Sequence, residues 1–268
     1  MKLLNHVIVV TGAGSGIGRE VVLEALQRGA RVAATDINAA TLAETAALAG
    51  TEDRLSTHVI DVADRAAVEA LPADVIGRFG AIDGVVHCAG IIQPFVRLKD
   101  LDYGVVDRVF RVNWLGTLYM TKTFLPLLLA RPEAHLVNVS SMGGFLPVPG
   151  QTVYGASKAA VKLLTEGLHS ECASTNLRVT VVFPGAVATN ITTNSGVEIP
   201  MSGERARAQA RRVMPADKAA RIILDGMERN AYRVMVGSDA KLMDRLYRLD
   251  PRRAAAFISR QMKNLLPT

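Results

Sequence analysis

The sequence has little cysteine, few aromatic residues and no long apolar run. Two cysteines, Cys88 and Cys172, occur among 268 residues, and both lie within expected regular elements. This usage excludes a disulfide scaffold and predicts a cytoplasmic protein, because reducing compartments keep thiols free. No apolar run approaches the ~20 residues that a membrane-spanning helix needs, so no membrane span is expected.

Motifs for metals and nucleic acids are missing too. The sequence has no zinc-ligand pattern and no basic motif interleaved with aromatic residues, so neither a metal site nor a nucleic-acid partner is expected. The formal net charge is +6, but residues 203–268 carry fifteen Lys or Arg against seven acids, whereas residues 1–202 carry sixteen against eighteen. The positive charge therefore belongs to the C-terminal end, where a solvated helix face is the simplest interpretation.

Short β-branched runs alternate with helical patterns as far as residue 236. Runs such as Val7-Ile8-Val9-Val10 are continuously apolar, which is typical of a parallel sheet with helices on both faces. The expected strands are His6–Thr11, Arg31–Asp36, Arg54–Asp61, Ile82–Cys88, Ala134–Ser140, Leu177–Phe183 and Tyr232–Val236. This order predicts an α/β fold: a single Rossmann-type doubly wound domain with a seven-stranded parallel sheet.

We divide the chain into a catalytic and dinucleotide-binding domain, residues 1–237, and a short, basic, helical C-terminal extension of it, residues 238–268. Ser238 and Asp239 are expected to cap a first helix, and Pro251 to open a second. The apolar positions of these helices are Leu242, Met243, Leu246, Leu249, Phe257, Ile258, Met262 and Leu265. We expect them to pack on the domain or on another subunit rather than on a membrane. We expect removal of the extension to alter assembly or substrate handling while it leaves the cofactor site intact.

A glycine-rich loop, Thr11-Gly12-Ala13-Gly14-Ser15-Gly16-Ile17-Gly18, follows the first expected strand and opens a helix. Glycines there allow a tight turn and a close approach of the backbone to a pyrophosphate at the positive end of the helix. Asp36 ends the second strand, where its carboxylate can accept hydrogen bonds from an adenosine ribose and would repel a 2′-phosphate. Neither Ser15 nor Ile37 offers that phosphate a positive charge. These residues predict NAD as the cofactor; the alternative is that Asp36 only caps a helix.

The spacing of Gly12, Gly16 and Gly18 resembles the short-chain dehydrogenase/reductase family, and further motifs follow in the family's order over residues 6–236. These motifs are Asp61-Val62, Ala89-Gly90, Arg111-Val112-Asn113, Asn138-Val139-Ser140-Ser141, Tyr154-Gly155-Ala156-Ser157-Lys158 and Pro184-Gly185-Ala186-Val187-Ala188-Thr189. The resemblance implies a catalytic tetrad of Asn113, Ser141, Tyr154 and Lys158. The cofactor site that it implies comprises Gly12, Ser15, Gly16, Ile17, Gly18, Asp36, Asp61, Val62, Ala89, Gly90, Tyr154, Lys158, Pro184, Gly185, Val187 and Thr189.

The tetrad makes chemical sense from its residue types. Tyr154 and Lys158 are four residues apart, so both project from one face of a helix. A free tyrosine titrates near 10, but a neighbouring ammonium and an oxidised nicotinamide both favour the phenolate. We therefore expect Tyr154 to be the general acid/base and Lys158 to tune it and hold the nicotinamide ribose. Ser141 is expected to orient the substrate oxygen, and Asn113, by resemblance, to hold a water that links Lys158 to solvent.

Cys88 departs from the family pattern, which has asparagine before the Ala-Gly pair. That amide ties neighbouring strands or loops together, and a thiol is a much weaker hydrogen-bonding group. We therefore expect reduced rigidity near the adenosine end, with Cys88 acting as a small buried hydrophobic residue.

The residues expected to border the substrate are mostly small or apolar: Gln93, Phe95, Ser141, Met142, Gly143, Phe145, Gln151, Gly185 and parts of the loop from Thr192 to Met201. None is Arg or Lys, so we expect an uncharged, hydrophobic secondary alcohol or ketone. One alternative is a reductase of carrier-bound 3-oxoacyl chains, which Asp36 disfavours because such enzymes generally use the phosphorylated cofactor. Another is a non-catalytic NAD-binding sensor or scaffold. The resemblance also implies a homodimer or homotetramer.

Overall fold

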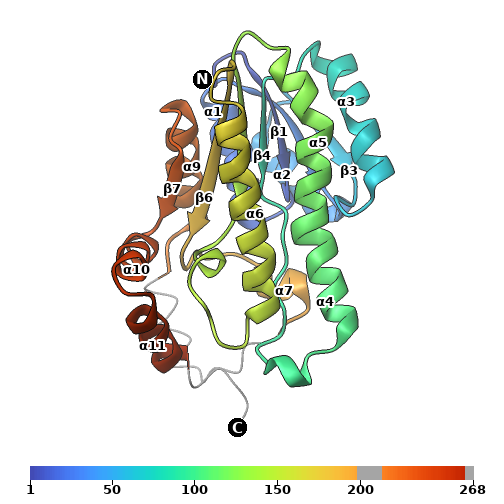
Figure 1. The fold of residues 1–268 in the computed structure, drawn as a ribbon. Helices are drawn as coiled ribbons and strands as arrows, with labels where there is room; N and C mark the ends of the chain where they lie inside the picture. The colour runs from blue at the N-terminus through green and yellow to red at the C-terminus, as the bar shows by residue number, and fades with distance from the viewer. Residues whose placement is uncertain (198–212, 263–268) are drawn as a thin grey trace.

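The computed structural model describes residues 1–197 and 213–262, which form one parallel sheet between two layers of helices (Figure 1). The strands are β1 (Val7–Thr11), β2 (Arg31–Asp36), β3 (Leu55–Val59), β4 (Gly84–His87), β5 (Ala134–Val139), β6 (Leu177–Pro184) and β7 (Arg233–Val236). The predicted doubly wound fold is confirmed, and every strand ends within two residues of its predicted bounds.

The strand order is β3-β2-β1-β4-β5-β6-β7, so the direction of winding reverses between β1 and β4. In such sheets the ligand crevice opens beside the carboxyl ends of the strands at the reversal. The register brings Thr11 level with Thr35 on β2 and with His87 on β4. The glycine loop, Asp36 and Cys88 therefore leave the sheet at the same edge.

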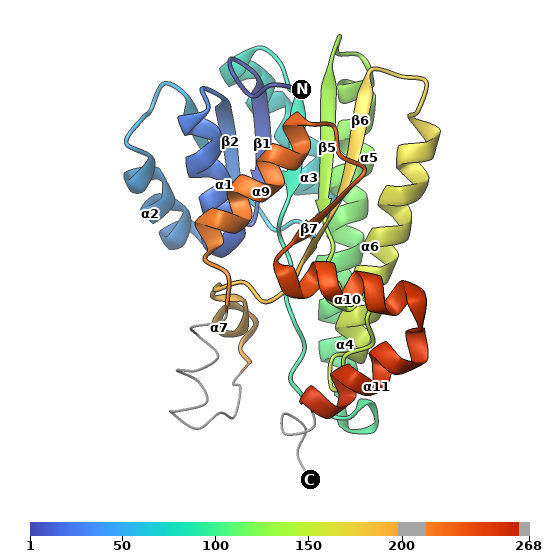
Figure 2. The ribbon, with the colours of Figure 1, turned by 90° about the vertical axis from the view of Figure 1, so that its left-hand side faces the viewer.

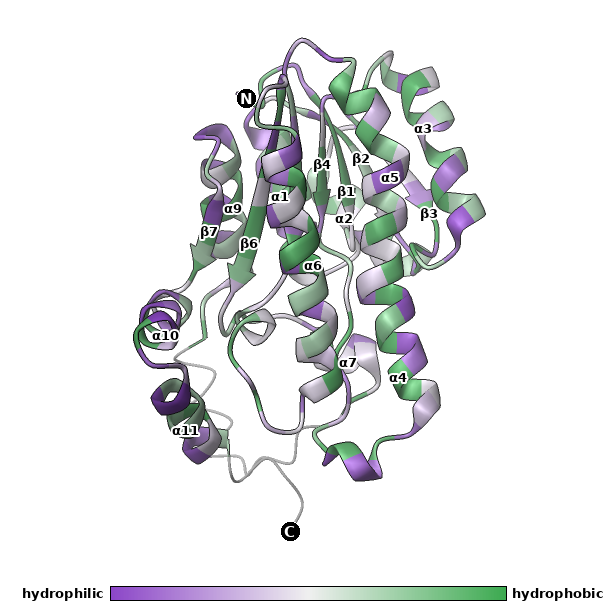
Figure 3. Cartoon of the chain, viewed as in Figure 1, coloured by the Kyte–Doolittle hydropathy of each residue, from purple (hydrophilic) through white to green (hydrophobic). Residues whose placement is uncertain are grey.

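Two layers of helices cover the sheet, as Figure 2 shows from the side. One layer contains α1 (Gly16–Gln27), α2 (Ala39–Ala49) and α9 (Ala216–Glu228), and the other contains α3 (Arg65–Phe79), α5 (Gly116–Leu129) and α6 (Thr152–Glu171). Along β1, Ile8 and Val10 face the first layer, and Val7 and Val9 face the second. The continuously apolar pattern of this strand thus follows from burial on both sides, and Figure 3 shows the central strands as hydrophobic.

Helix α4 (Tyr103–Phe110) runs into α5 through a π turn, η2 (Arg111–Leu115), in which Asn113 is buried. The Thr117 hydroxyl donates a hydrogen bond of 2.6 Å to Asn113 O, which satisfies a carbonyl in the distorted turn. Such π turns inside α-helices are frequent at functional sites. Three shorter elements complete this edge: η1 (Leu98–Asp100), η3 (Met142–Gly144) and α7 (Ile191–Ser195).

The C-terminal extension forms α10 (Ser238–Leu249) and α11 (Pro251–Met262). The predicted capping is wrong: Gly237 occupies the N-cap position with φ 111°, and the Asp239 carboxylate turns instead toward the chain after β6. Met243, Ala254 and Ile258 pack around Leu146. Met262 is half-buried against this cluster, whereas Leu242, Leu246, Leu249 and Phe257 are exposed.

Some sequence-based expectations fall on residues outside the described ranges. These are Leu265 and the central part of the segment Ala186–Met214, including Met201. Among residues 1–197 and 213–262, no helix is both long and apolar enough to cross a membrane.

Candidate active site

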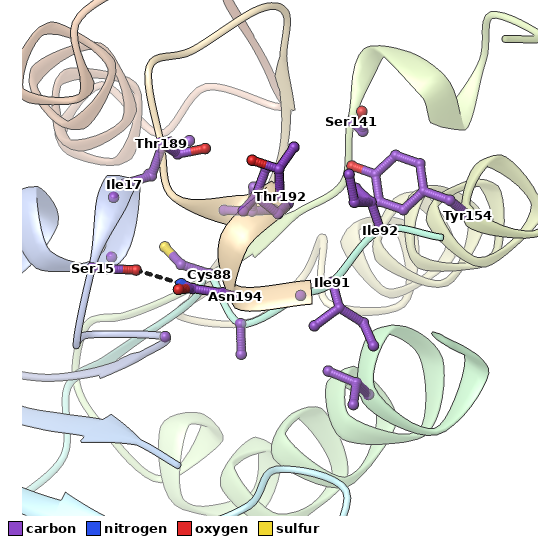
Figure 4. Close-up of a pocket in the computed structure, with 18 of the residues that line it drawn as sticks. Ser15, Ile17, Cys88, Ile91, Ile92, Ser141, Tyr154, Thr189, Thr192 and Asn194 are labelled. Atoms are coloured by element: carbon purple, nitrogen blue, oxygen red, sulfur yellow. Dashed lines mark hydrogen bonds between the residues drawn. The ribbon is translucent and has the colours of Figure 1, made fainter. Parts of the chain in front are cut away.

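A cavity of about 1190 Å³ opens at the carboxyl edge of the sheet. The glycine loop, the ends of β2 to β6 and helices α4, α6 and α7 contribute to its walls, part of which is shown in Figure 4. All the residues predicted for the dinucleotide site line it: Gly12, Ser15, Gly16, Ile17, Gly18, Asp36, Asp61, Val62, Ala89, Gly90, Tyr154, Lys158, Pro184, Gly185, Val187 and Thr189. Segments far apart in sequence therefore form one continuous hollow.

The glycine loop brings backbone close to backbone. Gly12 has φ +66°, and a Cβ atom there would lie 2.9 Å from the Ala89 nitrogen, while one on Gly18 would collide with the Gly12 carbonyl. The Ser15 side chain, at the N-cap position of α1, makes no capping hydrogen bond in the described part of the chain. The first N–H groups of this helix remain available to a phosphate, as the helix dipole also favours.

The Asp36 carboxylate is fixed by two backbone N–H groups. Oδ2 accepts from Gly14 N at 2.8 Å and Oδ1 from Asn38 N at 2.9 Å. Asp36 is not the cap of α2, because Asn38 occupies that position and accepts from Ala40 and Thr41. The alternative interpretation of Asp36 as a helix cap is therefore wrong, and its half-buried carboxylate lines the cavity.

Arg19 approaches this corner but is already engaged. Its guanidinium donates to Gly14 O, Thr41 O and the Thr45 hydroxyl, and it forms an ion pair of 2.8 Å with Glu44. The positive charge of Arg19 is thus bonded to protein groups and partly neutralised by Glu44.

Ser141, Tyr154 and Lys158 meet at the cavity wall, and Figure 4 shows Ser141 above the Tyr154 ring. Tyr154 lies in the first turn of α6 and Lys158 one turn later, as their spacing predicts. Lys158 is 3% exposed. Its Nζ donates to Val139 O at 3.0 Å, and its carbonyl accepts from the Ser140 hydroxyl at 2.7 Å. The lysine is therefore anchored to the end of β5.

Burial changes the acidity of both groups. Burial raises the pKa of Tyr154, and a hydrogen bond with the neighbouring Ser141 hydroxyl partly offsets that rise. Burial lowers the pKa of Lys158 to about 8, with Cys88 acting in the opposite direction. In the protein alone, the phenol consequently stays protonated at neutral pH and can donate a proton, while the lysine loses its charge more easily than in water.

Asn113 joins the π turn to two parts of the site. Its amide nitrogen donates to Ile91 O at 2.9 Å and to the Ser157 hydroxyl at 3.0 Å, and its Oδ1 accepts from Ile91 N at 2.9 Å. Ser157 in turn donates to Tyr154 O at 2.7 Å. The loop after β4 and the start of α6 are therefore tied together through Asn113.

A buried histidine, His87, stands directly before Cys88 and bonds to the first strand. The Thr11 hydroxyl bonds to His87 Nδ1 at 2.8 Å and accepts from Ala89 N at 3.1 Å. These bonds link the ends of β1 and β4 directly beside Cys88. Burial raises the pKa of the Cys88 thiol to about 12, which agrees with an unreactive small side chain.

Five of the predicted substrate contacts lie outside the cavity. Gln93 and Gln151 are 0% and 5% exposed. The Gln93 amide bonds to the backbone at the start of α6, and the Gln151 amide donates to Gln93 O in the loop after β4. The Phe145 ring packs edge-on against Phe183 at 5.5 Å, and Gly143 and Phe145 line a separate hollow. Met142 packs against the cluster around Leu146. The predicted contacts that do line the cavity are Phe95, Ser141, Gly185, Thr192 and Asn194.

Other cavity residues were missed by sequence reasoning. Ile91, Ile92 and Ile191 add apolar surface, and Arg108 and Arg111 of the α4–η2 segment add cationic groups. The premise that no Arg or Lys borders this space is therefore wrong. Arg108 lies on the exposed face of an amphipathic helix in sequence, and only packing of α4 beside α7 places it here, where it donates to Ser195 O at 3.4 Å.

Helix α7 crosses the cavity between the glycine loop and the loop after β4. Asn194 donates to the Ser15 hydroxyl at 2.8 Å, a bond drawn in Figure 4, and Ser195 Oγ accepts from Ile92 N at 3.0 Å. The segment after β6 thus borders both the expected phosphate position and the tetrad.

The C-terminal extension reaches the same segment. Asp239 Oδ2 accepts from Ala186 N at 2.8 Å, and a Cβ on Gly185 would collide with this carboxylate. The extension is consequently joined to the chain that the family places over the nicotinamide. This contact argues against our expectation that removing the extension would leave the cofactor site intact.

Comparison with known proteins agrees with this geometry. Residues 6–199 match the family model described as short chain dehydrogenase, so the chain belongs to the short-chain dehydrogenase/reductase family. The SadH protein of Mycobacterium tuberculosis, named as an oxidoreductase, is 35% identical over 252 residues, 91% of this chain and 90% of that protein. A 3-oxoacyl-[acyl-carrier-protein] reductase, FabG of Thermotoga maritima, is 36% identical over 195 residues, 72% of this chain and 78% of that protein.

Solved structures of the family have the same fold. A short-chain dehydrogenase/reductase from Burkholderia phymatum in complex with NAD has a TM-score of 0.82 at 24% identity, covering 94% of this chain and 96% of that one. One from Burkholderia cenocepacia in complex with NADP has a TM-score of 0.80 at 26% identity, covering 96% and 99%. The protein is thus an oxidoreductase of a fold that binds NAD or NADP.

Proposed function

We propose that the protein is an NAD-dependent enzyme that transfers a hydride between the nicotinamide and an uncharged, mainly hydrophobic secondary alcohol or ketone. The observation that supports this most directly is one cavity that contains Ser141, Tyr154 and Lys158 together with Asp36 and the uncapped start of α1. A non-catalytic sensor would not need Ser141, Tyr154 and Lys158.

The residues present fit a dinucleotide. The α1 N–H groups would hold the pyrophosphate, the Asp36 carboxylate would accept from the adenosine ribose, and Lys158 would donate to the nicotinamide ribose. Bound NAD would supply the hydride acceptor in oxidation, and NADH the donor in reduction. The engaged Arg19 and the fixed carboxylate of Asp36 both disfavour a 2′-phosphate.

The chain's own residues handle the proton. The Ser141 hydroxyl would donate a hydrogen bond to the substrate oxygen and orient it. In reduction, the Tyr154 hydroxyl gives its proton to the carbonyl oxygen as that oxygen becomes a hydroxyl; in oxidation, the phenolate takes the proton back. Lys158 supports the phenolate by its positive charge.

Apolar lining around Tyr154 favours a hydrophobic substrate. Ile91, Ile92, Phe95 and Ile191 all border the cavity, and such walls with a few polar groups are typical of small-molecule sites. The Arg108 guanidinium already donates to Ser195 O, which reduces its availability to an anionic substrate.

A second candidate is reduction of carrier-bound 3-oxoacyl thioesters. The similarity to FabG of Thermotoga maritima favours it, as does the basic extension, which would suit an acidic carrier. Asp36 disfavours it wherever that chemistry depends on NADPH.

We further propose a homodimer or homotetramer in the cytoplasm, with no nucleic-acid partner and no stable membrane association. The free thiols Cys88 and Cys172 and the exposed apolar stripe Leu242, Leu246 and Leu249 support the location and the assembly respectively. A sizing column coupled to light scattering tests the assembly, and cell fractionation tests the location.

The decisive experiment is a turnover screen followed by absorbance of the reduced cofactor. Hydrophobic secondary alcohols with NAD, and matching ketones and 3-oxoacyl thioesters with NADH or NADPH, should be compared on the same protein. We expect turnover of alcohols and ketones with NAD(H). Turnover restricted to thioesters with NADPH would favour the second candidate, and cofactor binding without any turnover would favour a sensor.

A further inference from the structure

The buried Gln93 side chain caps the helix that carries Tyr154. Its Oε1 accepts from Val153 N at 2.8 Å and from Tyr154 N at 2.9 Å, and its Nε2 donates to Gly150 O at 3.0 Å. The Gln93 carbonyl also accepts from Gln151 Nε2 at 2.7 Å. A residue sixty positions before the helix therefore satisfies the first turn of α6.

Helix α6 needs such a partner. Gln151 at its N-cap position makes no side-chain capping bond to the described residues, and the first N–H groups of any helix lack acceptors within it. An unsatisfied first turn frays most easily, and Tyr154 lies in that turn. A cap supplied at Tyr154's own N–H thus acts directly on the backbone that carries the phenol.

The same backbone is also held at its carbonyl. Ser157 donates to Tyr154 O and bonds to Asn113, and Asn113 holds both backbone groups of Ile91, two residues before Gln93. The bonds form a closed ring that passes through the tyrosine backbone. Opening the ring at Gln93 removes the acceptor at Tyr154 N and leaves the bond at Tyr154 O.

Lys158 does not depend on this ring. It is held by Val139 O and Ser140 one turn further along the helix. A disturbance of the first turn therefore separates the two residues, because it moves the phenol and leaves the ammonium in place.

We propose that Gln93 is a positioning residue for Tyr154, holding the first turn of α6 so that the phenol meets the substrate oxygen. This inference rests on the proposed function for its kinetic test. Gln93 is itself fully buried and does not line the cavity, so it acts through Tyr154 and not by contact with substrate.

The test compares Gln93→Leu with Gln151→Leu. Both substitutions replace a buried amide at the same place, but only Gln93→Leu removes the acceptor at Tyr154 N. Because misplacement of a reacting group by about 1 Å costs roughly 10²-fold in rate, we expect kcat to fall about that much in Gln93→Leu. The dissociation constant for NADH should stay near the wild-type value, and Gln151→Leu should keep its kcat. Equal losses in both variants, or a Gln93→Leu protein with unchanged kcat, would overturn the proposal.

Gln93→Glu adds a readout that a purely structural role would not change. A protonated glutamic acid can accept from Val153 N and Tyr154 N and donate to Gly150 O, as the amide does. After ionisation it faces that carbonyl with a negative charge, and the repulsion displaces the first turn of α6 that carries Tyr154. The rate of ketone reduction relative to wild type should therefore be high at low pH and fall as pH rises. A ratio independent of pH would contradict the proposal.

Hydrogen exchange distinguishes failure of this inference from failure of the proposed function. If the wild-type protein reduces no ketone, the proposed function fails, but protection of the amides in residues 152–155 can still be compared. Faster exchange there in Gln93→Leu than in Gln151→Leu supports the positioning role, and equal exchange rejects it. If Gln93→Leu does not fold, Gln93→Glu at low and high pH supplies the same comparison.

Discussion

The choice between NAD and NADP depends on the Asp36 carboxylate, and Asp36→Ala should weaken that choice by a predictable amount. Removing the side chain leaves Gly14 N and Asn38 N without their acceptors. That effect is common to both cofactors and cancels in the ratio of their catalytic efficiencies. Two further effects do not cancel, namely the lost acceptors for the ribose and the lost repulsion of a 2′-phosphate.

Simple electrostatics gives the size of these effects. One unit charge about 5 Å from another contributes roughly 0.8 kcal/mol in water and about 3 kcal/mol at an effective dielectric constant near 20. A hydrogen bond to a charged acceptor contributes about 1.5–3 kcal/mol. Since Asp36 is half-buried and partly solvated, the low ends apply, and together they give about 2–3 kcal/mol. The NAD/NADP ratio of kcat/KM should therefore fall roughly 10²-fold.

Steady-state kinetics with both cofactors at fixed substrate measures this ratio. Asp61→Asn is the matched control, because Asp61 also lines the cavity but is not the expected ribose partner; it should weaken both cofactors alike. Adding Glu44→Gln to Asp36→Ala should raise activity with NADP further, because it frees Arg19 from its ion pair. A wild-type protein that already uses NADP as well as NAD, or an unchanged ratio in Asp36→Ala, would refute the reasoning.

Three other expectations follow from the site and the core. Tyr154→Phe should lower kcat by at least about 10²-fold with NADH binding retained, and Lys158→Met should lower both kcat and the affinity for NADH. Turnover measures kcat, and fluorescence titration with NADH measures binding. A Tyr154→Phe protein that keeps most of its activity would show that another group transfers the proton. Truncation after Gly237 should weaken NADH binding in the same titration, and so should Asp239→Ala alone, because both changes remove the acceptor at Ala186 N. Asp239→Asn keeps an acceptor oxygen and should retain most of the affinity for NADH. Burial lowers the pKa of His87 and His135 to about 3. The stability that these neutral histidines contribute above pH 6.5 is therefore lost as pH falls toward 3, at about 1.4 kcal/mol per histidine per pH unit. In urea unfolding from pH 6 to 4, the dependence of the unfolding free energy on pH should be shallower by that amount in His135→Gln, and a wild-type slope in that variant would contradict this expectation.

Local signals in the sequence predicted most of the fold and the chemical groups of the site. Strand β1 is apolar at every position because it is buried on both faces, so its pattern is readable without knowing its neighbours. The glycine loop and the Tyr154–Lys158 pair are also local signals. The loop is a single turn of the chain, and the pair is separated by a single turn of helix. Their meeting in one cavity follows from the carboxyl ends of parallel strands sharing an edge.

The errors concern contacts between distant segments. Gln93 and Gln151 stand near the tetrad in sequence terms, but their amides bond to backbone groups that only the packed loops bring within reach. Likewise, Arg108 reaches the cavity because α4 lies beside α7. The Thr11 hydroxyl bonds to His87, seventy-six residues away. Spacing along the chain contains no information about such pairs.

The two contacts that hold the catalytic segments from outside have one physical feature in common. Gln93 accepts from the backbone of Tyr154, and Asp239 accepts from the backbone of Ala186. In each case a side chain outside the family motifs satisfies an N–H within one of them. A buried N–H without an acceptor is costly, so Gln93, whose partners are buried or partly buried, restricts where the first turn of α6 can lie without touching the reacting atoms. Asp239 adds a bond to an exposed N–H of the segment after β6. The precision of the site therefore depends on residues that no motif contains.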